Sequence, residues 1–368
     1  MNFNAPLLRP VRILLFPFSL LYALIIWIRN KLFDKGWIGS SSFNLPMIGV
    51  GNLSAGGTGK SPMVEHILST FGEQFKLAVL SRGYKRKTSG YALADEQSNA
   101  LEIGDEPMQF YSKFPSVTIA VGEERIVAIP QLLHDRPDTE VIILDDAYQH
   151  RYIKPGLNIL LTDCNNLFTR DWFLPTGDLR DLPSSYKRAD ILIVSKCAPH
   201  LSEPHKKQIE EEIKPQEHQD LFFTSIQYGT PYHIVSKAEK DLNGNMEALL
   251  ISGIANPKPL KKFLCDHTSS YHEMLYGDHH IFTIDDLKDI RKRFENITAE
   301  EKIIITTEKD ATRLDKFRND LAGYPVYVLP IKVKFLFDEE RRFTELITNF
   351  ITTYSRKNSE SDAREEAI

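Results

Sequence analysis

A glycine-rich segment that ends in lysine and serine is the clearest chemical signal in this chain. It reads Ser54, Ala55, Gly56, Gly57, Thr58, Gly59, Lys60 and Ser61. An apolar run at residues 46–51 precedes it, and a helical pattern at residues 63–71 follows it. A loop in this setting cradles phosphates with its backbone N–H groups and the helix N-terminus. We therefore expect Lys60 to reach the β- and γ-phosphates of a nucleotide and Ser61 to bind Mg²⁺, although the usual opening glycine is Ser54.

The second half of such a site should be an apolar strand that ends in a carboxylate. Residues 141–145 form such a run, and Asp145 and Asp146 stand together at its end. We expect Asp145 to hold Mg²⁺, directly or through water. Because two acids exceed what one metal ligand requires, Asp146 is a catalytic candidate, and Gln149 and His150 are candidates for nucleotide binding. The alternative is a pair of acids that caps a helix; the phosphate loop favours the site.

The expected nucleotide is ATP rather than GTP. GTP-binding proteins with this loop read guanine with an Asn/Thr-Lys-x-Asp segment after a strand. The nearest segment here, residues 195–198, reads Ser-Lys-Cys-Ala and lacks the aspartate. ATP and Mg²⁺ are therefore the predicted cofactors.

Alternating strands and helices are expected to position these residues. Short apolar runs, typical of parallel strands buried on both faces, lie at residues 46–51, 77–81, 117–121, 141–145, 157–162 and 191–195. Helical patterns between them, for example at residues 125–133, predict a doubly wound α/β domain with a mostly parallel sheet. A second alternation predicts a smaller α/β domain, with strands at 248–252, 302–306 and 326–329 and helices at 259–265, 284–294 and 311–317.

These patterns divide the chain into five predicted parts. They are an N-terminal membrane-associated helix (1–35), a P-loop ATP-binding domain (36–220), a two-stranded β linker (221–240), a smaller α/β domain with a long C-terminal helix (241–354), and a disordered tail (355–368). The linker is predicted from two β-like stretches joined by Gly-Thr-Pro at 229–231, which look like a hairpin. The tail has many charges and no aromatic residue, and this composition favours disorder.

The N-terminal segment is predicted to contact a membrane. Residues 13–28 are uncharged and largely apolar, and basic residues stand on both sides. Residues 1–35 carry a net charge of +4, which leaves −9 on the rest of the chain. A buried core helix is the alternative, but the basic flanks favour membrane contact. Spanning the bilayer and lying in its interface both stay open, and a chain without residues 1–35 is expected to keep ATP binding.

Composition excludes several other classes of protein. The chain has 368 residues, of which 42% are hydrophobic, so it can bury a core without disulfides. Its three cysteines form no CxxC pair, which fits a reducing compartment. The net charge of −5 argues against nucleic acid as a partner, and no obligate protein partner is predicted.

With these motifs in place, the chain resembles the tetraacyldisaccharide 4'-kinase family. The resemblance covers nearly the whole chain and rests on segments at residues 51–62, 81–84, 104–107, 145–150, 174–180, 278–280 and 306–311. The family's opening serine in the phosphate loop matches Ser54. Its catalytic base, an aspartate in Gly-Asp-Glu-Pro, corresponds to Asp105, and the histidine that assists it corresponds to His279. The family's Mg²⁺-binding glutamate after arginine corresponds to Asp181, which is one methylene shorter.

The resemblance implies a function and a location. The activity is transfer of the ATP γ-phosphate to the 4'-hydroxyl of a tetraacylated glucosamine disaccharide 1-phosphate, a glycolipid, giving lipid IVA in lipid A biosynthesis. The location is the cytoplasmic face of the inner membrane, reached through residues 1–35. Arg125 and Arg180 are further candidates for phosphate contacts, and the alternative for Arg125 is a surface helix residue. The basic segment at residues 81–87 could meet a phosphate or be a solvated turn.

Two other functions remain open at this stage. One is a membrane-tethered P-loop ATPase switch of the partitioning or metal-insertion type, which would use water as acceptor. Such ATPases commonly carry a second lysine near the start of the loop, and residues 52–58 lack one. The other is a non-catalytic nucleotide-binding scaffold, against which the joint presence of Lys60, Ser61 and Asp145 argues.

Overall fold

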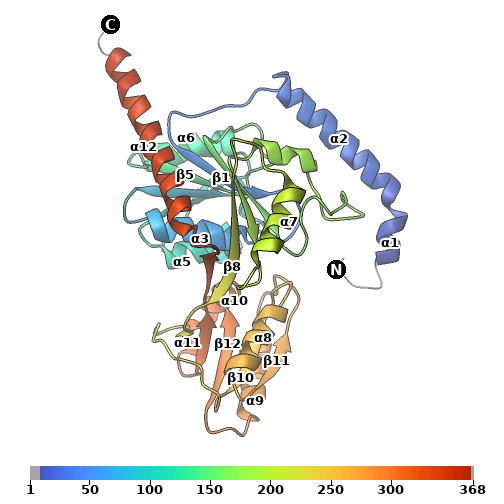
Figure 1. Cartoon of the computed structure of the whole chain (residues 1–368). Helices are drawn as coiled ribbons and strands as arrows, with labels where there is room; N and C mark the ends of the chain where they lie inside the picture. The colour runs from blue at the N-terminus through green and yellow to red at the C-terminus, as the bar shows by residue number, and fades with distance from the viewer. Residues whose placement is uncertain (1–8, 366–368) are drawn as a thin grey trace.

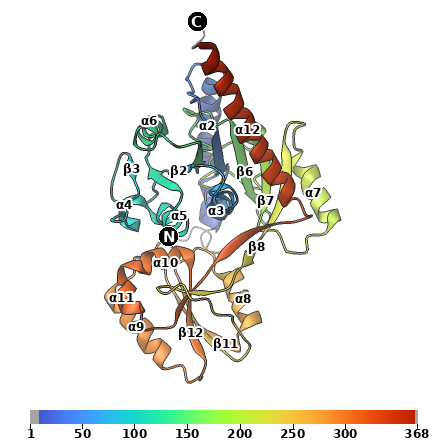
Figure 2. The ribbon, with the colours of Figure 1, turned by 90° about the vertical axis from the view of Figure 1, so that its left-hand side faces the viewer.

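The computed structural model describes residues 9–365, with side chains from residue 12 to residue 354, and it contains two β-sheets (Figure 1). In spatial order, the larger sheet consists of β14 (Ile331–Phe335), β8 (Asp220–Tyr228), β7 (Ile191–Ser195), β6 (Leu157–Asp163), β1 (Met47–Asn52), β5 (Val141–Asp145), β2 (Leu77–Ser81), β4 (Thr118–Val121) and β3 (Ala92–Leu93). The smaller sheet consists of β11 (Ser270–Leu275), β10 (Glu247–Ser252), β12 (Lys302–Thr307), β13 (Val326–Leu329) and β9 (Tyr232–His233). Figure 2 shows them as two lobes, here called the large and the small lobe.

Helices cover both faces of the large sheet. They are α3 (Lys60–Phe71), α4 (Ala100–Ile103), α5 (Asp105–Lys113), α6 (Arg125–Asp135), α7 (Glu203–Ile213), a 3-10 turn (Pro183–Arg188) and α12 (Glu340–Glu365). Along β5, Val141 and Ile143 pack with α3, α5 and α12, whereas Ile142 and Leu144 pack with α6. Strands with apolar side chains on both faces are what a doubly wound parallel sheet requires. The predicted fold class is confirmed.

The small lobe is a second α/β layer structure. Its helices are α8 (Lys258–His267), α9 (Ile284–Glu295), α10 (Glu308–Leu314), a 3-10 turn (Asp315–Phe317) and α11 (Arg318–Leu321). Strands β11, β10, β12 and β13 are parallel, and β9 pairs antiparallel at one edge. Helix α9 begins with a capping box in which Thr283 and Asp286 satisfy each other's backbone N–H groups.

The connection between the lobes differs from the predicted hairpin at 221–240. Strand β8 pairs with β7 and with the distant β14, whereas β9 joins the small sheet beside β13. Gly229 N donates to Pro330 O at 2.9 Å, so the chain leaves and re-enters the large lobe at one place. The hairpin was wrong because local β-like patterns do not determine which strands pair. The two-stranded connection itself is present, with β14 in place of the second half of the hairpin.

The C-terminal helix is longer than predicted. Phe343, Ile347 and Ile351 are buried against the large sheet, which fixes the first turns of α12 there. The helix continues to Glu365 through the region where composition favours disorder. Glu, Arg and Ala in this region are good helix formers, so the backbone can continue a helix that packing has already started. Residues 366–368 lie outside the described part of the chain.

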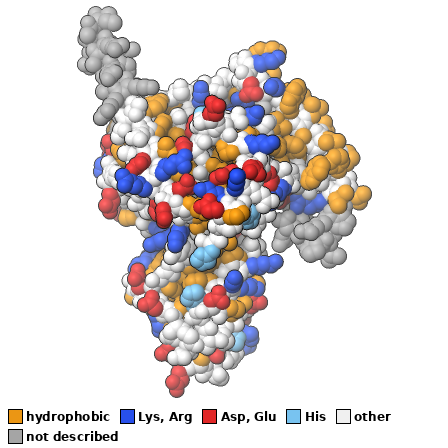
Figure 3. All heavy atoms as spheres, viewed as in Figure 1, with side chains coloured by type: hydrophobic (Ala, Val, Ile, Leu, Met, Phe, Trp, Pro, Cys, Tyr) orange, Lys and Arg blue, Asp and Glu red, His pale blue; other side chains and the backbone are white. Residues whose placement is uncertain are grey.

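The N-terminal segment forms α1 (Arg9–Leu14) and α2 (Phe16–Asp34), and α2 has its apolar side outward. Its exposed side chains include Phe18, Leu21, Leu24 and Ile25, each more than half exposed. Figure 3 shows hydrophobic side chains gathered over this helix. By length and composition α2 could cross a membrane. A helix with apolar groups in solvent and polar groups toward the protein reverses the usual globular pattern and fits a lipid surface.

Candidate active site

The phosphate loop follows β1 and leads into α3, as predicted. Gly59 has a φ of +84° and precedes Lys60, the first residue of α3, with no side chain capping the helix. Gly56 has a φ of +118°, which only glycine adopts without strain. A Cβ added at Gly56 or Gly57 would meet no atom within 4 Å. The loop therefore leaves open space in front of uncapped helix N–H groups, where phosphate oxygens can bind.

Side chains from neighbouring strands hold this loop in shape. Asn52 Nδ2 donates to Thr58 Oγ1 at 2.8 Å, and Ser195 Oγ donates to Thr58 O at 2.7 Å. Lys196 donates to Gly57 O and forms an ion pair with Asp163 at 2.8 Å. Because β1, β6 and β7 are parallel, their carboxyl ends bring these groups to one edge of the sheet.

Asp146 joins the loop lysine to an arginine. Lys60 Nζ lies 3.5 Å from Asp146 Oδ1, and both Arg180 terminal nitrogens bond the same carboxylate, one of them at 3.1 Å. Burial acts to raise the pKa of Asp146, but Lys60 and Arg180 outweigh it and hold that pKa well below its usual range. Asp146 has a φ of +49°, an uncommon backbone conformation of the kind found at functional sites. These three predicted residues therefore lie together.

Asp145 is a buried carboxylate beside other acids. It is 5% exposed, and Ser81 Oγ donates to its Oδ2 at 2.9 Å. Burial raises the pKa of Asp145 to about 7, and the charges of Glu106 and Asp146 act in the same direction. The effect of Glu106 shows that the start of α5 faces the end of β5. Within the described residues, no group of three His, Cys, Asp or Glu side chains forms a metal cage.

Arg125 is buried, and its guanidinium lies close to the acidic pair at the end of β5. It is 2% exposed, and its terminal nitrogens donate to Gly122 O and, at 3.1 Å, to Asp145 O. Burial lowers its pKa to about 10, although Asp145 and Asp146 act to raise it. The interpretation of Arg125 as a surface helix residue was wrong, because the guanidinium ties the start of α6 to the end of β5.

Gln149 and His150 follow the acidic pair on the same loop. Gln149 Nε2 donates to Asn52 O at 2.7 Å, so Gln149 supports the strand that leads into the phosphate loop. The His150 imidazole is neutral, because burial, then Arg125 and Arg82, lower its pKa to about 4. Neither fact assigns a contact with the nucleotide base.

Asp181 lies in a different setting from the other predicted metal ligands. It is 1% exposed. Its Oδ1 accepts hydrogen bonds from Asn30 at 2.7 Å and Ser185 at 2.9 Å, and its Oδ2 accepts one from Arg188 at 2.9 Å. These donors already satisfy both oxygens, so Asp181 holds the chain together here. We do not keep it among the metal ligands proposed below.

The predicted Asp105–His279 pair is present and joins the two lobes. Asp105 is the first residue of α5, and His279 follows β11 with a φ of +63°. His279 Nδ1 lies 2.8 Å from Asp105 Oδ2, whereas Lys309 Nζ lies 3.5 Å from Nε2. Arg313 Nη2 lies 3.2 Å from the same Nδ1, so an acid and a guanidinium meet at this nitrogen. The ring of Tyr84, from the predicted basic segment, packs edge-on against His279 at 5.8 Å.

Arg313 is the important residue that the sequence did not reveal. Its guanidinium donates to Asp105 Oδ2 at 2.7 and 3.1 Å and to Asp310 Oδ1 at 3.0 Å. Burial alone would raise the pKa of Asp105, but hydrogen bonds from His279 and Arg313 lower it to about 2. Thr307 caps α10, with its side chain accepting a hydrogen bond from Asp310 N. The i, i+3 spacing of Asp310 and Arg313 was the only local signal, and it does not point to Asp105 in the other lobe.

Comparison with known proteins places this arrangement in one family. The family model described as tetraacyldisaccharide-1-P 4'-kinase matches residues 11–352. The chain is 44% identical to the tetraacyldisaccharide 4'-kinase of Parabacteroides distasonis, over 92% of this chain and 95% of that protein. It is also 44% identical to the enzyme of the same name from Flavobacterium johnsoniae, over 93% and 97%. The fold matches a crystal structure described as the "apo" form of LpxK from Aquifex aeolicus in complex with ATP, with a TM-score of 0.72, 28% identity, and coverage of 93% and 99%.

Proposed function

The chain belongs to the tetraacyldisaccharide 4'-kinase family, and from that premise we propose that it transfers the γ-phosphate of ATP to the 4'-hydroxyl of a tetraacylated glucosamine disaccharide 1-phosphate. The product would be lipid IVA, the 4'-phosphorylated lipid A precursor. One observation supports the proposal: Asp105 bonds His279 of the small lobe, and the preceding Gly104 packs against Gly83, which follows β2 at the edge of the sheet where the phosphate loop opens. A phosphate-binding loop and a proton acceptor at one sheet edge are what transfer to an alcohol requires.

The phosphate loop and the acidic pair would bind the nucleotide. Backbone N–H groups of residues 55–60 would hold the phosphates, and Lys60 would move from Asp146 toward the β- and γ-oxygens. Arg180 lies within bonding distance of Asp146, which also pairs with Lys60, and it would stabilise charge on the transferring group. Fixed positive groups of this kind are worth several kcal/mol in a transition state, about 2.7–4 per donor.

The donor set at the loop fits Mg²⁺. A hydroxyl from Ser61 and a carboxylate from Asp145 are hard oxygen ligands, and kinase Mg²⁺ sites use one or two carboxylates together with phosphate oxygens. The buried acids Asp145 and Asp146, with Glu106 nearby, make a negative environment that a cation would relieve. When bound, the ion neutralises charge on the β- and γ-phosphates. Ser61 and Asp145 are therefore the proposed ligands.

The Asp105–His279 pair would accept the proton of the sugar hydroxyl. A carboxylate with a pKa of about 2 is a weak base by itself. The imidazole 2.8 Å away is a second group that can hold a proton, so the two side chains would accept it together. His279 comes from the small lobe, so the full pair exists only while the lobes are together.

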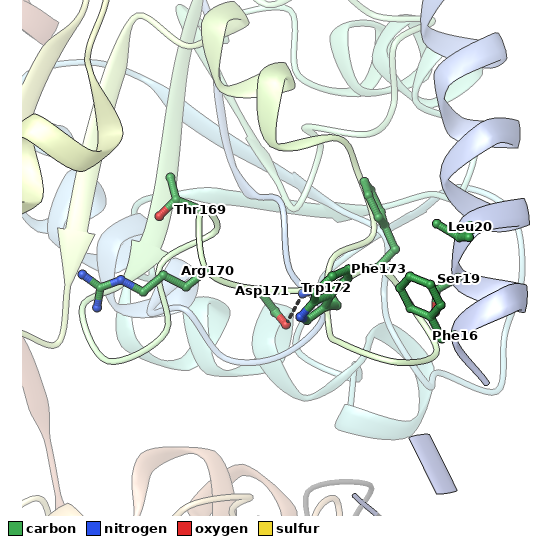
Figure 4. Close-up of a pocket in the computed structure, with 8 residues that line it drawn as sticks. All are labelled: Phe16, Ser19, Leu20, Thr169, Arg170, Asp171, Trp172 and Phe173. Carbon is green, nitrogen blue, oxygen red and sulfur yellow. Dashed lines mark hydrogen bonds between the residues drawn. The ribbon is translucent and has the colours of Figure 1, made fainter. Parts of the chain in front are cut away.

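The lipid would approach along α2. The outward apolar side of this helix would lie in the cytoplasmic face of the inner membrane, the side on which ATP is present. A cavity of about 370 Å³ lies between α2 and residues 169–173. Figure 4 shows Phe16, Leu20, Trp172 and Phe173 among the residues that line it. Apolar walls beside the bilayer suit acyl chains, so only the sugar would need to reach the cleft.

The test is labelled phosphate transfer to defined acceptors. The full-length protein in detergent micelles is incubated with γ-labelled ATP and either the disaccharide 1-phosphate or its 4'-deoxy analogue, and the products are identified by mass spectrometry. We expect label at the 4'-position of the first acceptor and none on the analogue. Release of free phosphate at the same rate with and without lipid would contradict the proposal and favour the ATPase switch. Lys60→Ala serves as the inactive control.

A further inference from the structure

Helix α2 turns polar side chains toward the large lobe, and these contacts lead to the phosphate loop. We infer that α2 is a structural part of the nucleotide site, with Asn30 as a positioning residue that fixes Asp181 and, through it, Arg180. The inference rests on the proposed function only in requiring that the phosphate loop binds MgATP. It gives the helix a second role besides membrane contact, and it contradicts the expectation that a chain without residues 1–35 keeps ATP binding.

Asn30 is the buried end of this connection. It is 5% exposed, although it lies in a helix whose other side is apolar and open. Its Nδ2 donates to Asp181 Oδ1 at 2.7 Å and to Ser185 Oγ at 3.3 Å, and its backbone oxygen accepts from Arg151 at 2.9 Å. Membrane binding gives no reason for a buried amide here. A buried carboxylate such as Asp181, in contrast, depends on its donors, and the Asn30 amide is the shortest of the three hydrogen bonds to Oδ1, beside those from Ser185 and Leu182 N.

Asp181 is adjacent to the residue that reaches the acidic pair. Arg180 N donates to Leu53 O at 2.8 Å, and Ala55 N donates to Asp178 O at 2.6 Å, so this segment pairs with the start of the phosphate loop. The Arg180 side chain then bonds Asp146 and Asn52. From α2, Tyr22 OH donates to Arg180 O at 3.1 Å. Helix α2 therefore holds the Arg180 segment at two points, the backbone oxygen of Arg180 and the side chain of the adjacent Asp181.

A second connection reaches the same strand from the other direction. Arg29 donates to the backbone oxygen of Gln149 at 2.7 Å, and Gln149 Nε2 donates to Asn52 O at 2.7 Å. Asn52 Nδ2 in turn holds Thr58 in the loop. Two independent sets of hydrogen bonds thus converge on Asn52, one through Arg180 and one through Gln149. Convergence on one loop-supporting residue is the geometry expected of a scaffold for that loop.

The spacing along α2 separates the two roles of the helix. The residues that contact the large lobe, Ser19, Tyr22, Arg29 and Asn30, lie on one side of the helix, and Ser19 also bonds Thr176 at 2.7 Å. Leu24, which is 51% exposed, lies on the outward side. Substitutions can therefore disturb either role alone.

The test measures MgATP affinity in full-length protein kept in the same detergent. Asn30→Leu keeps the side-chain volume but leaves Asp181 without its amide donor. We expect the Kd for MgATP to rise about 10-fold, which corresponds to about 1.4 kcal/mol, and kcat to fall as well, because the displaced Arg180 is also proposed to stabilise the transferring group. Vesicle co-sedimentation should stay unchanged. The matched control is Leu24→Ala on the outward side, for which the Kd should stay at the wild-type value.

A milder variant guards against a folding defect in Asn30→Leu. Tyr22→Phe removes only the hydroxyl that donates to Arg180 O, and we expect a rise in Kd of about 3-fold with no change in Tm. The inference would be overturned if the Kd for MgATP is unchanged in Tyr22→Phe and Asn30→Leu shows either an unchanged Kd or a lower Tm alone. In that case α2 would serve only as an anchor. If wild-type protein itself fails to bind MgATP, the proposed function fails first.

Discussion

Replacing Asp105 with asparagine should separate catalysis from nucleotide binding. The change keeps the shape of the side chain and removes its charge, so the proton of the acceptor hydroxyl loses its acceptor. Loss of a general base typically costs about 10²–10⁴-fold in rate. The nucleotide is held by the phosphate loop, Lys60 and Asp145, and MgATP affinity should therefore stay near wild type. His279→Ala should act on the same step, because its Nδ1 bonds Asp105.

The same substitution should lower stability by an amount that the structure predicts. The pKa of Asp105 falls from 3.8 to about 2 on folding, chiefly through His279 and Arg313, and its side chain is 17% exposed. A folded-state pKa below the unfolded value stabilises the protein above the unfolded pKa, and the contribution is lost as the pH falls through the folded pKa. A shift of about 1.8 units corresponds to about 2.4 kcal/mol at pH 7 and about 0.8 kcal/mol at pH 2.5.

Urea unfolding of wild type and Asp105→Asn at several pH values measures this difference. We expect a loss of about 2 kcal/mol at pH 7 that shrinks steadily below pH 4, alongside a slowed phosphate transfer. Isothermal titration with MgATP gives the affinity. The assigned roles are wrong if Asp105→Asn loses MgATP binding or turns over at close to the wild-type rate. A stability difference that does not depend on pH would refute the electrostatic origin of the Asp105 pKa.

Further predictions concern the other parts of the molecule. Lys60→Ala should reduce turnover at saturating MgATP by at least about 10²-fold with Tm unchanged, and near-normal turnover would remove the loop from the mechanism. Asp145→Asn should weaken MgATP binding and slow every reaction of bound ATP, which titration with MgATP checks. A double change of Leu24 and Ile25 to asparagine should reduce vesicle co-sedimentation, and full pelleting would refute lipid contact by α2. Burial, then Glu308, raises the Glu65 pKa to about 7 from 4.5, so stability should fall as the pH rises between these values, and Glu65→Gln should flatten that slope in unfolding curves.

Much of the large lobe could be predicted because its strands are continuous apolar runs. Strands β2, β5 and β7 have the predicted bounds, β6 ends one residue later than predicted, and β1 is shifted by one residue. Each of these strands has a neighbouring strand on both sides and helices on both faces. Because such a strand is buried throughout, its sequence is apolar throughout and can be recognised. The phosphate loop could also be predicted, because the loop backbone needs glycines at fixed positions before Lys60. That requirement depends only on residues within the loop.

The edge strands β11 and β14 were missed, because strands at a sheet edge are less buried and their sequences are therefore less apolar. Strand β11 lies at the edge of the small sheet, and its side chains are exposed or half-buried throughout. In β14, Lys332 and Lys334 alternate with apolar residues, a period-2 pattern that could have identified the strand. Pairing was harder still, because β8 takes β14 as a partner about 100 residues away and the nearer β9 belongs to the other sheet. Edge strands and long-range pairs depend on tertiary context that no local pattern contains.

The active-site residues also differ in whether the nearby sequence predicts them or whether they depend on distant parts of the chain. Lys60, Ser61, Asp145 and Asp146 follow strands whose ends meet at one sheet edge, so sequence and topology together bring them into one place. Arg313, in contrast, bonds Asp105 across 208 positions of the chain. Nothing in its neighbourhood distinguishes it from a helix surface arginine, because its role depends on how the lobes meet.

Asn30 shows the same limit within a segment whose overall character was plain from sequence. The surrounding residues are so apolar that one amide adds little to any average over the segment. That amide is nevertheless 5% exposed and bonds a carboxylate that is 1% exposed. A polar side chain buried in this way must have a partner, and its partner is adjacent to an arginine that bonds Asp146. In an anchor helix, the residues that break the apolar pattern therefore indicate what the helix does for the folded protein, whereas the pattern itself indicates only where the helix lies.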